Sequence, residues 1–359
     1  MERIDKYELP IETENIPCVT DFWIYNRLII IKTSKYYTDW IASHYNLFSK
    51  LSNYDFNFGE TGLTDPNYHD DILARKQIKI FKVNKDKIVE KLKRYLLKGY
   101  YINIYIKNDT ENVSYHEVVI YGFDDLNKCF SAVRLKNRRF ERFELAYSYL
   151  VDTWHDVQEF FYNNQTNGVH LSMVFQHPAT LFKLKKTYIN DNCTFEAYKK
   201  LRKELYGTEL KVLSAQGYSQ FNNQSSCYTG IACLNVLDSM ITQIIDGSTQ
   251  NLTAHNVIRA AKKLFEHRQM LLVAMQYVYD KWNMCMNTKA TDLIKEYEGS
   301  CKAVERWLML ALRYDKTNNI NCLKMILEEI PVVYNNERAI LNNFINNSID
   351  WKIFNKKFI

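Results

Sequence analysis

Glycine, proline and long apolar runs are scarce in this sequence. Its 359 residues include only 10 Gly and 5 Pro, and they contain no low-complexity segment or internal repeat. Long flexible linkers and repeat architectures are therefore not expected. No run approaches the roughly 20 apolar residues that span a bilayer, and the polar, acidic start of the chain lacks the apolar core of a signal peptide. We expect a cytoplasmic protein without a membrane partner.

Residue patterns of metal sites are also missing. The eight cysteines are scattered without a CxxC pair, so neither a zinc ribbon nor a disulfide scaffold is indicated. The histidine-containing segments HDVQEF and VFQHP lack HExxH spacing. We therefore predict reduced thiols, no metal and no bound cofactor.

Charge gives only a weak indication of partners. Hydrophobic residues make up 47% of the chain and charged residues 25%, which is typical of a globular protein with a large core. The net charge of +6 is spread along the sequence, although a short basic patch covers Lys136–Arg142. We predict no nucleic-acid partner and a modest preference for acidic surfaces.

The spacing of apolar residues predicts an α+β arrangement with a mainly antiparallel sheet in the first half of the chain. Helices are expected over residues 18–33, 36–51, 86–98 and 145–162. The third of these ends at Gly99, a residue type that commonly follows helices. Strands are expected over residues 78–83, 100–107, 115–121, 129–135 and 169–176, and a loop is expected over residues 53–77.

After Pro178 only helical spacing remains. Helices are expected over residues 194–206, 228–246, 253–282, 288–314 and 318–347. We therefore predict two domains, an α+β domain over residues 1–178 and an all-α domain over residues 179–359.

Cys18 and His116 are the first candidates for chemistry. Cys18 follows Pro17 at the start of the first predicted helix, where the helix macrodipole would favour a thiolate, the competent nucleophile. His116 heads the first strand of a β-hairpin, on one face with Val118, while Glu117 lies on the other face. Each residue alone also fits a purely structural role, Cys18 as a small buried thiol and His116 as a half-buried strand residue. Together they have the chain order of a papain-like site, in which an imidazole activates a cysteine.

Two short segments resemble a known family. The run HEVVIYGFDDLNKCFSAVRL, headed by His116, resembles the histidine strand of papain-like bacterial proteins, and IPCVTDFWIYNRLIII resembles their nucleophile helix. The group that these segments resemble is the butirosin-H-like acyltransferases, with related amide synthases of nonribosomal peptide pathways such as that of closthioamide. LFEHRQMLLVAMQY, residues 264–277, is similar to a Glu-His-basic segment in the helical C-terminal region of some relatives.

The resemblance implies a papain-like fold and an amide-forming acyl transfer. Cys18 would attack an acyl thioester on the phosphopantetheine arm of an acyl or peptidyl carrier protein. His116 would take the thiol proton and later activate a small amine acceptor. Because a thioester is already activated, the step needs positioning and an oxyanion hole but no ATP or metal. The backbone amide of Cys18 would be one oxyanion donor.

The sequence departs from the papain pattern at the residue that orients the histidine. The return strand offers Ser131 where Asn or Asp is usual, so the site is either a dyad or uses Ser131 or a residue from elsewhere. Asp124 and Asp125 lie in the turn, about 25 Å along the strand from His116, and are expected to hold that turn. Asn26 is a candidate oxyanion side chain, with a helix-surface residue as the alternative.

A rival nucleophile lies in the second half. Cys227 follows two serines in QSSCYTG, with His255 and His267 further along the chain. Because no sheet is predicted there to present a histidine, a helix cap is the simpler interpretation. His267, between Glu266 and Arg268, is expected to be a structural site of ion pairs and hydrogen bonds.

The sequence is compatible with three functions. The first is the cysteine-dependent acyltransferase or amide synthase. The second is a cysteine peptidase or amidohydrolase that uses the same Cys18–His116 pair with water as acceptor. The third is a catalytically inactive relative that docks a carrier protein, which the absence of an orienting Asn or Asp suggests.

Overall fold

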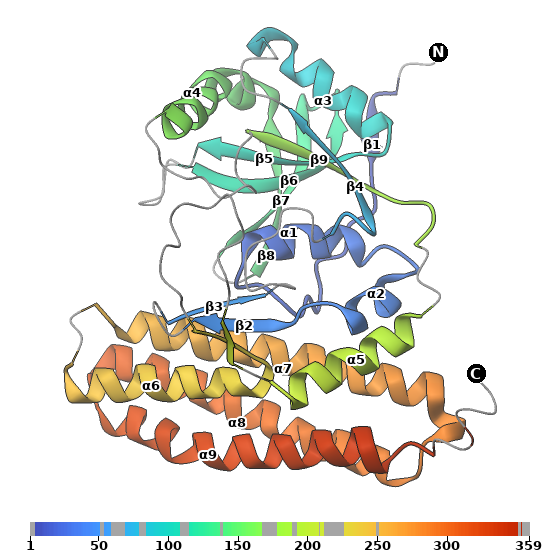
Figure 1. Cartoon of the computed structure of the whole chain (residues 1–359). Coiled ribbons are helices and arrows are strands. Elements are labelled where there is room, and N and C mark those ends of the chain that lie inside the picture. Colours follow the sequence, from blue (N-terminus) through green and yellow to red (C-terminus); the bar gives the residue numbers. More distant parts are fainter. Residues whose placement is uncertain are drawn as a thin grey trace. The chain divides into compact units, whose positions relative to one another are not determined.

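An antiparallel sheet of seven strands is the centre of the first part of the chain (Figure 1). The computed structural model describes residues 4–50, 54–58, 69–78, 84–107, 115–136, 139–166, 178–188, 192–207, 209–211, 226–248, 251–350 and 353. The strands run in the order β4 (Leu73–Ile78), β9 (Ala179–Leu184), β5 (Tyr101–Lys107), β6 (Tyr115–Asp124), β7 (Cys129–Lys136) and β8 (Arg139–Ala146). The short strand β1 (Lys6–Glu8) pairs with the far end of β6.

Helices cover both faces of this sheet (Figure 1). On one face, α3 (Ile88–Leu97) and α4 (Tyr147–Thr166) bury their apolar sides against strand residues such as Ile104 and Ile120. On the other face, α1 (Phe22–Ile31) contacts β6 and β9. A short 3-10 turn, η1 (Lys85–Lys87), leads into α3, and Gly99 follows that helix with a φ of 79°. The predicted helix over residues 86–98 and its glycine cap are confirmed.

The chain divides into two compact units, but not at residue 178. The first unit contains residues 1–37 and 64–189, and the second contains residues 38–63 and 190–359. Strand β9 explains the later boundary, because it pairs with both β4 and β5 inside the sheet. The early segment 38–63 belongs to the second unit because its strand β2 pairs with β11, beyond residue 208, and its strand β3 pairs with β2.

The second unit is mainly helical. Its long helices are α5 (Cys193–Leu205), α6 (Cys233–Asp246), α7 (Ala254–Trp282), α8 (Lys289–Thr317) and α9 (Asn321–Asn342), with shorter turns at α2 (Tyr37–Ser43), η3 (Gly230–Ala232), η4 (Asn283–Cys285) and η5 (Asn343–Asn347). The predicted helices over residues 194–206, 253–282 and 288–314 correspond to α5, α7 and α8. Among the described residues, no helix has both the length and the apolar character needed to cross a membrane.

The prediction of an all-α second domain is wrong in one respect. A four-stranded antiparallel sheet, in the order β10 (Glu209–Lys211), β11 (Ser226–Thr229), β2 (Leu47–Lys50) and β3 (Asp55–Phe58), belongs to the second unit. The helix predicted over residues 36–51 ends at Ser43 because Tyr45 has a φ of 66°, which a right-handed helix excludes. The loop predicted over residues 53–77 likewise contains β3 and part of β4. Of the strand predicted over residues 78–83, only Ile78 is described, as the last residue of β4, and the strand predicted over residues 169–176 lies outside the described residues.

Candidate functional site

Cys18 lies before α1, not at its first turn. The helix begins at Phe22 with Asp21 as N-cap, and the Asp21 carbonyl accepts hydrogen bonds from the amides of Ile24 and Tyr25. Cys18 is therefore three residues ahead of the cap, where the helix macrodipole acts on it only weakly. Its side chain is buried, with 0% exposure. The expectation that the Cys18 amide is a helix-start oxyanion donor is wrong.

The segment that carries Cys18 runs along α1. The Glu12 amide donates to the Ile29 carbonyl at 3.1 Å, near the end of the helix, and the Lys32 ammonium lies 3.4 Å from the Asn15 carbonyl oxygen. Asp21 then begins α1 at its other end. Because both ends of the segment are attached to α1, Cys18 lies on the α1 side of the sheet.

Glu117, rather than His116, is the β6 residue that faces α1. The Asn26 side-chain amide, in the second turn of α1, donates to Glu117 Oε2 at 3.0 Å and to Asn103 Oδ1 at 3.1 Å. Asn103 also donates from its amide to Glu117 Oε1. Neighbouring residues on a strand point to opposite faces, so His116 points away from α1.

His116 belongs to the face covered by α3 and α4. It pairs with Ile106 of β5, and Ile106 is part of the apolar core on that face. Residues directly opposite in a sheet share a face. The His116 Nδ1 atom lies 3.0 Å from the backbone carbonyl of Glu117, and the ring is half-buried. The described arrangement therefore places Cys18 and His116 on opposite sides of the sheet and does not bring the predicted pair together.

Ser131 does not orient His116 either. It lies opposite Gly122 in the β6–β7 register, six strand residues and therefore roughly 20 Å from His116. Its hydroxyl donates to Glu8 Oε1 of β1 at 2.7 Å. Ser131 thus helps to hold β1 against the sheet, and its predicted catalytic role has no support in the geometry.

The turn aspartates have the structural role predicted for them. Asp124 Oδ1 accepts hydrogen bonds from the amides of Leu126 and Asn127, both at 3.0 Å, and the bond from the Asn127 amide is the main cause that lowers the pKa of Asp124. Asp125 accepts from Lys93 at 2.6 Å and from the Tyr147 hydroxyl at 2.9 Å. The turn is therefore attached to α3 and to the start of α4.

A buried polar cluster on the α1 side replaces the predicted dyad as the candidate site. It consists of Asn26 and Arg27 from α1, Asn103 from β5 and Glu117 from β6, none more than 4% exposed. The guanidinium of Arg27 also stacks over Phe182 of β9, 4.8 Å from the ring centre. Asn26 is thus a buried residue, and the helix-surface alternative is wrong. Asn26 Oδ1 is buried without a hydrogen-bond donor among the described residues.

Burial sets the electrostatics of this cluster. It raises the pKa of Glu117 to about 7, although the charge of Arg27 and the hydrogen bonds from Asn103 and Asn26 favour the ionised carboxylate. Burial also raises the pKa of Tyr25 and Tyr105, and the negative charge of Glu117 adds to both shifts. A carboxyl group with a pKa near 7 exchanges its proton readily at neutral pH, which is the property required of a general acid or base.

Two residues of this cluster stand out in the sequence by their polarity. Asn103 and Glu117 are polar residues within otherwise apolar strands, YINIYIK and YHEVVIY. A polar residue in the middle of a buried strand requires a partner. Such residues therefore mark a buried polar site even when no motif is present.

The rival site in the second unit has no assembled nucleophile among the described residues. The backbone of Cys227 lies in β11 rather than at a helix start, and the positions of Gln220 and Gln224 fall outside the described residues. His267 is fully buried, with Nε2 3.4 Å from Glu204 Oε2 and Nδ1 3.4 Å from Arg268 Nη1. These contacts fit the structural role predicted for it. Within the described ranges, no group of three or more His, Cys, Asp or Glu residues is placed to hold a metal ion.

No protein-family model matches the chain, and no curated protein matches it.

Proposed function

We propose that this chain is a cysteine-dependent acyltransferase of papain-like organisation, with Cys18 as nucleophile and the Glu117 cluster as its proton acceptor. The observation that carries the proposal is that Cys18 and Glu117 both lie on the α1 side of the sheet. The resemblance of the Cys18 and His116 segments to the butirosin-H-like acyltransferases supports the reaction class. That resemblance alone supports a carrier-bound thioester as donor and an amine as acceptor.

The proposed reaction has two balanced steps. The Glu117 carboxylate accepts the Cys18 thiol proton, the sulfur forms a bond to the acyl carbon, and the bond to the carrier sulfur breaks as that sulfur takes up the proton. An amine then bonds to the acyl carbon, the bond between the acyl carbon and the Cys18 sulfur breaks, and the amine proton passes through Glu117 to the Cys18 sulfur. A pKa of about 7 suits Glu117 to both transfers. A general base of this kind contributes roughly 10² to 10⁴ in rate.

The decisive experiment measures an acyl–enzyme by intact mass. The protein is incubated with an acyl pantetheine thioester, with and without a small amine. We expect an acyl adduct that is absent in Cys18→Ala, at least roughly a hundredfold slower to form in Glu117→Gln, and little changed in the matched variant His116→Gln. Circular dichroism of each variant controls for folding. If His116→Gln abolishes the adduct while Glu117→Gln preserves it, the assignment of Glu117 is wrong.

The acceptor is tested with the same adduct. An adduct that persists in water and disappears only when amine is added supports acyl transfer. An adduct that water removes equally fast supports the peptidase or amidohydrolase alternative.

A docking protein without chemistry is the second candidate. The observations in its favour are the zero exposure of Cys18 and the position of His116 on the far face of the sheet. It predicts no acyl adduct on the folded wild-type protein under any condition. That result would contradict the acyltransferase proposal.

A further inference from the structure

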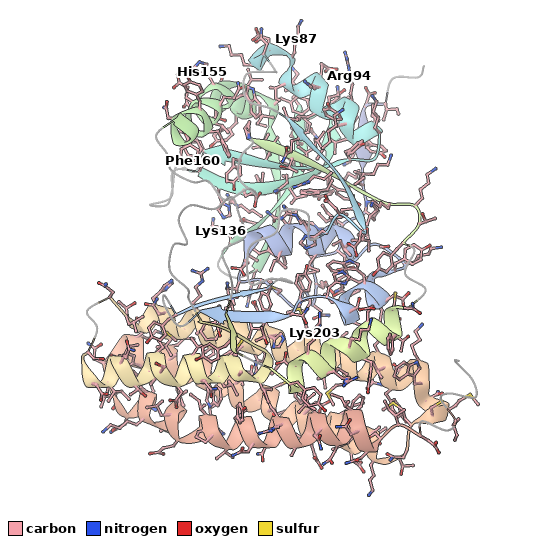
Figure 2. The ribbon with its side chains drawn as sticks, viewed as in Figure 1. Lys87, Arg94, Lys136, His155, Phe160 and Lys203 are labelled. Carbon is pink, nitrogen blue, oxygen red and sulfur yellow. The ribbon has the colours of Figure 1, made fainter. Side chains whose placement is uncertain are left out.

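The outer side of α3 carries a row of cations that no described residue neutralises. Lys87, Lys91, Arg94 and Lys98 follow one another at intervals of four, three and four residues, so they lie on one face of the helix over roughly 16 Å. None of the four forms an ion pair with another described residue. Figure 2 shows Lys87 and Arg94 at the outer edge of the helix, away from the sheet.

Two further cations flank this row. Lys76 of β4 lies over the ring of Tyr95, 5.3 Å from its centre, and Lys183 of β9 lies over the ring of Tyr100, at 5.5 Å. The Lys183 ammonium also donates to the Lys98 carbonyl at the end of α3. We call the six cations, four along α3 and its two caps and two beside it, the α3 basic surface.

This arrangement is unfavourable for the isolated helix. Like charges three or four residues apart destabilise a helix by about 0.2–0.5 kcal/mol per pair, and Lys87 places a positive charge at the positive end of the macrodipole. The acidic residue within the row, Glu90, lies 3.2 Å from Lys93, which also pairs with Asp125. Arg94 and Lys98 lie at the end of α3 where the macrodipole favours cations, but none of the four cations has an ion-pair partner among the described residues, so an external anionic partner would neutralise them.

We propose that the α3 basic surface docks an acidic helix of a partner protein. The apolar side of α3, with Ile88, Leu92 and Leu96 at 0% exposure, is packed on the sheet, so it has no apolar side to insert into a membrane. Tyr95 and Tyr100 have their ring faces covered by lysines, which disfavours base stacking of a single-stranded nucleic acid. A rigid row of cations at helical spacing complements carboxylates at the same spacing on another helix.

The test uses a synthetic helical peptide of about 18 residues with Glu at the matching i, i+4, i+7 and i+11 positions. Its control peptide carries Gln at those positions. We expect the Glu peptide to bind the full chain, and to bind roughly tenfold more weakly when salt rises from about 50 to 300 mM. The variant Lys91→Glu/Arg94→Glu should lose at least roughly tenfold in affinity. Lys295→Glu/Lys302→Glu on α8 changes the net charge equally and should bind like the wild type.

Acetylation of lysines provides a second readout that does not depend on a variant. The bound Glu peptide should protect Lys91 and Lys98 from acetylation and leave Lys295 unprotected. Equal weakening by the α3 and α8 variants, or binding of the Gln peptide as strong as that of the Glu peptide, would overturn the proposal. So would stronger α3-dependent binding to anionic vesicles or duplex DNA than to the Glu peptide. None of these measurements depends on acyl transfer.

Discussion

The ionisation of one buried side chain, Glu117, makes the stability of the first unit depend on pH. Burial raises its pKa in the folded protein to about 7, against about 4.3 in an unfolded chain. Between these values the folded state binds the proton more tightly than the unfolded state. The free energy of unfolding therefore decreases as the pH rises from about 4.3 to about 7, by about 4 kcal/mol in total, and the loss remains at higher pH.

Replacing Glu117 by Gln removes this titration. We expect the stability of the wild type relative to Glu117→Gln to fall by roughly 2–3 kcal/mol between about pH 5 and pH 8. Urea unfolding of both proteins at the two pH values measures it. Glu305→Gln, an exposed site on α8, is the control and should show little change with pH. A difference between wild type and Glu117→Gln that does not vary with pH would contradict the pKa assigned to Glu117.

Two glycines allow a matched test of how closely the backbone of β1 approaches β6. A Cβ on Gly122 of β6 would lie 2.6 Å from the Tyr7 carbonyl oxygen, whereas a Cβ on Gly299 of α8 meets no atom within 4 Å. We expect Gly122→Ala to displace β1 and to destabilise by about 1–3 kcal/mol. We expect Gly299→Ala to stabilise by up to about 1 kcal/mol, because alanine favours a helix. Thermal unfolding compares the two, and equal effects would mean that β1 does not approach Gly122 closely.

At the scale of elements, a buried ion pair connects α7 with α9. Arg268 of α7 donates to both carboxylate oxygens of Glu337 of α9, at 3.1 and 2.9 Å, and both side chains have 0% exposure. We expect Arg268→Met to destabilise by about 3–5 kcal/mol, since it leaves an uncompensated buried carboxylate. The double variant Arg268→Met/Glu337→Leu should recover most of that loss. A double-mutant cycle by urea unfolding measures the coupling, and additive single effects would count against it.

Elements were predictable where local chemistry decides them. Helical spacing and Gly99 were sufficient to predict α3, and a polar turn between two apolar strands was sufficient to predict the β6–β7 hairpin. The alternation of β6 also correctly separated His116 from Glu117. What the sequence could not provide was which face of β6 meets α1, because both faces of that strand are largely apolar. That choice is made by contacts with Asn103 on the preceding strand and with Asn26, which lies 91 residues away in the chain.

At the scale of the whole chain, contacts between residues distant in sequence also explain why the domain boundary could not be predicted. Strands β2 and β3 come early in the sequence, yet β2 pairs with β11, which comes more than 150 residues later, and β3 joins the same sheet through β2. Such pairings leave no mark in local composition. A boundary based on where strand patterns stop therefore assigned residues 38–63 to the wrong unit and missed β9.

The position of β9 gives a direct test of this division. A fragment of residues 1–178 lacks the strand that joins β4 to β5, so it leaves both strands with unpaired edges and loses core residues such as Leu181, which is 0% exposed in the full chain. A fragment of residues 1–188 restores that strand. We expect the longer fragment to show a cooperative thermal transition by circular dichroism and the shorter one to lack it or to aggregate. Both fragments retain β2 and β3 without their partners, so any difference between them reports on β9 alone. Equal cooperative unfolding of the two fragments would show that the first unit folds without β9.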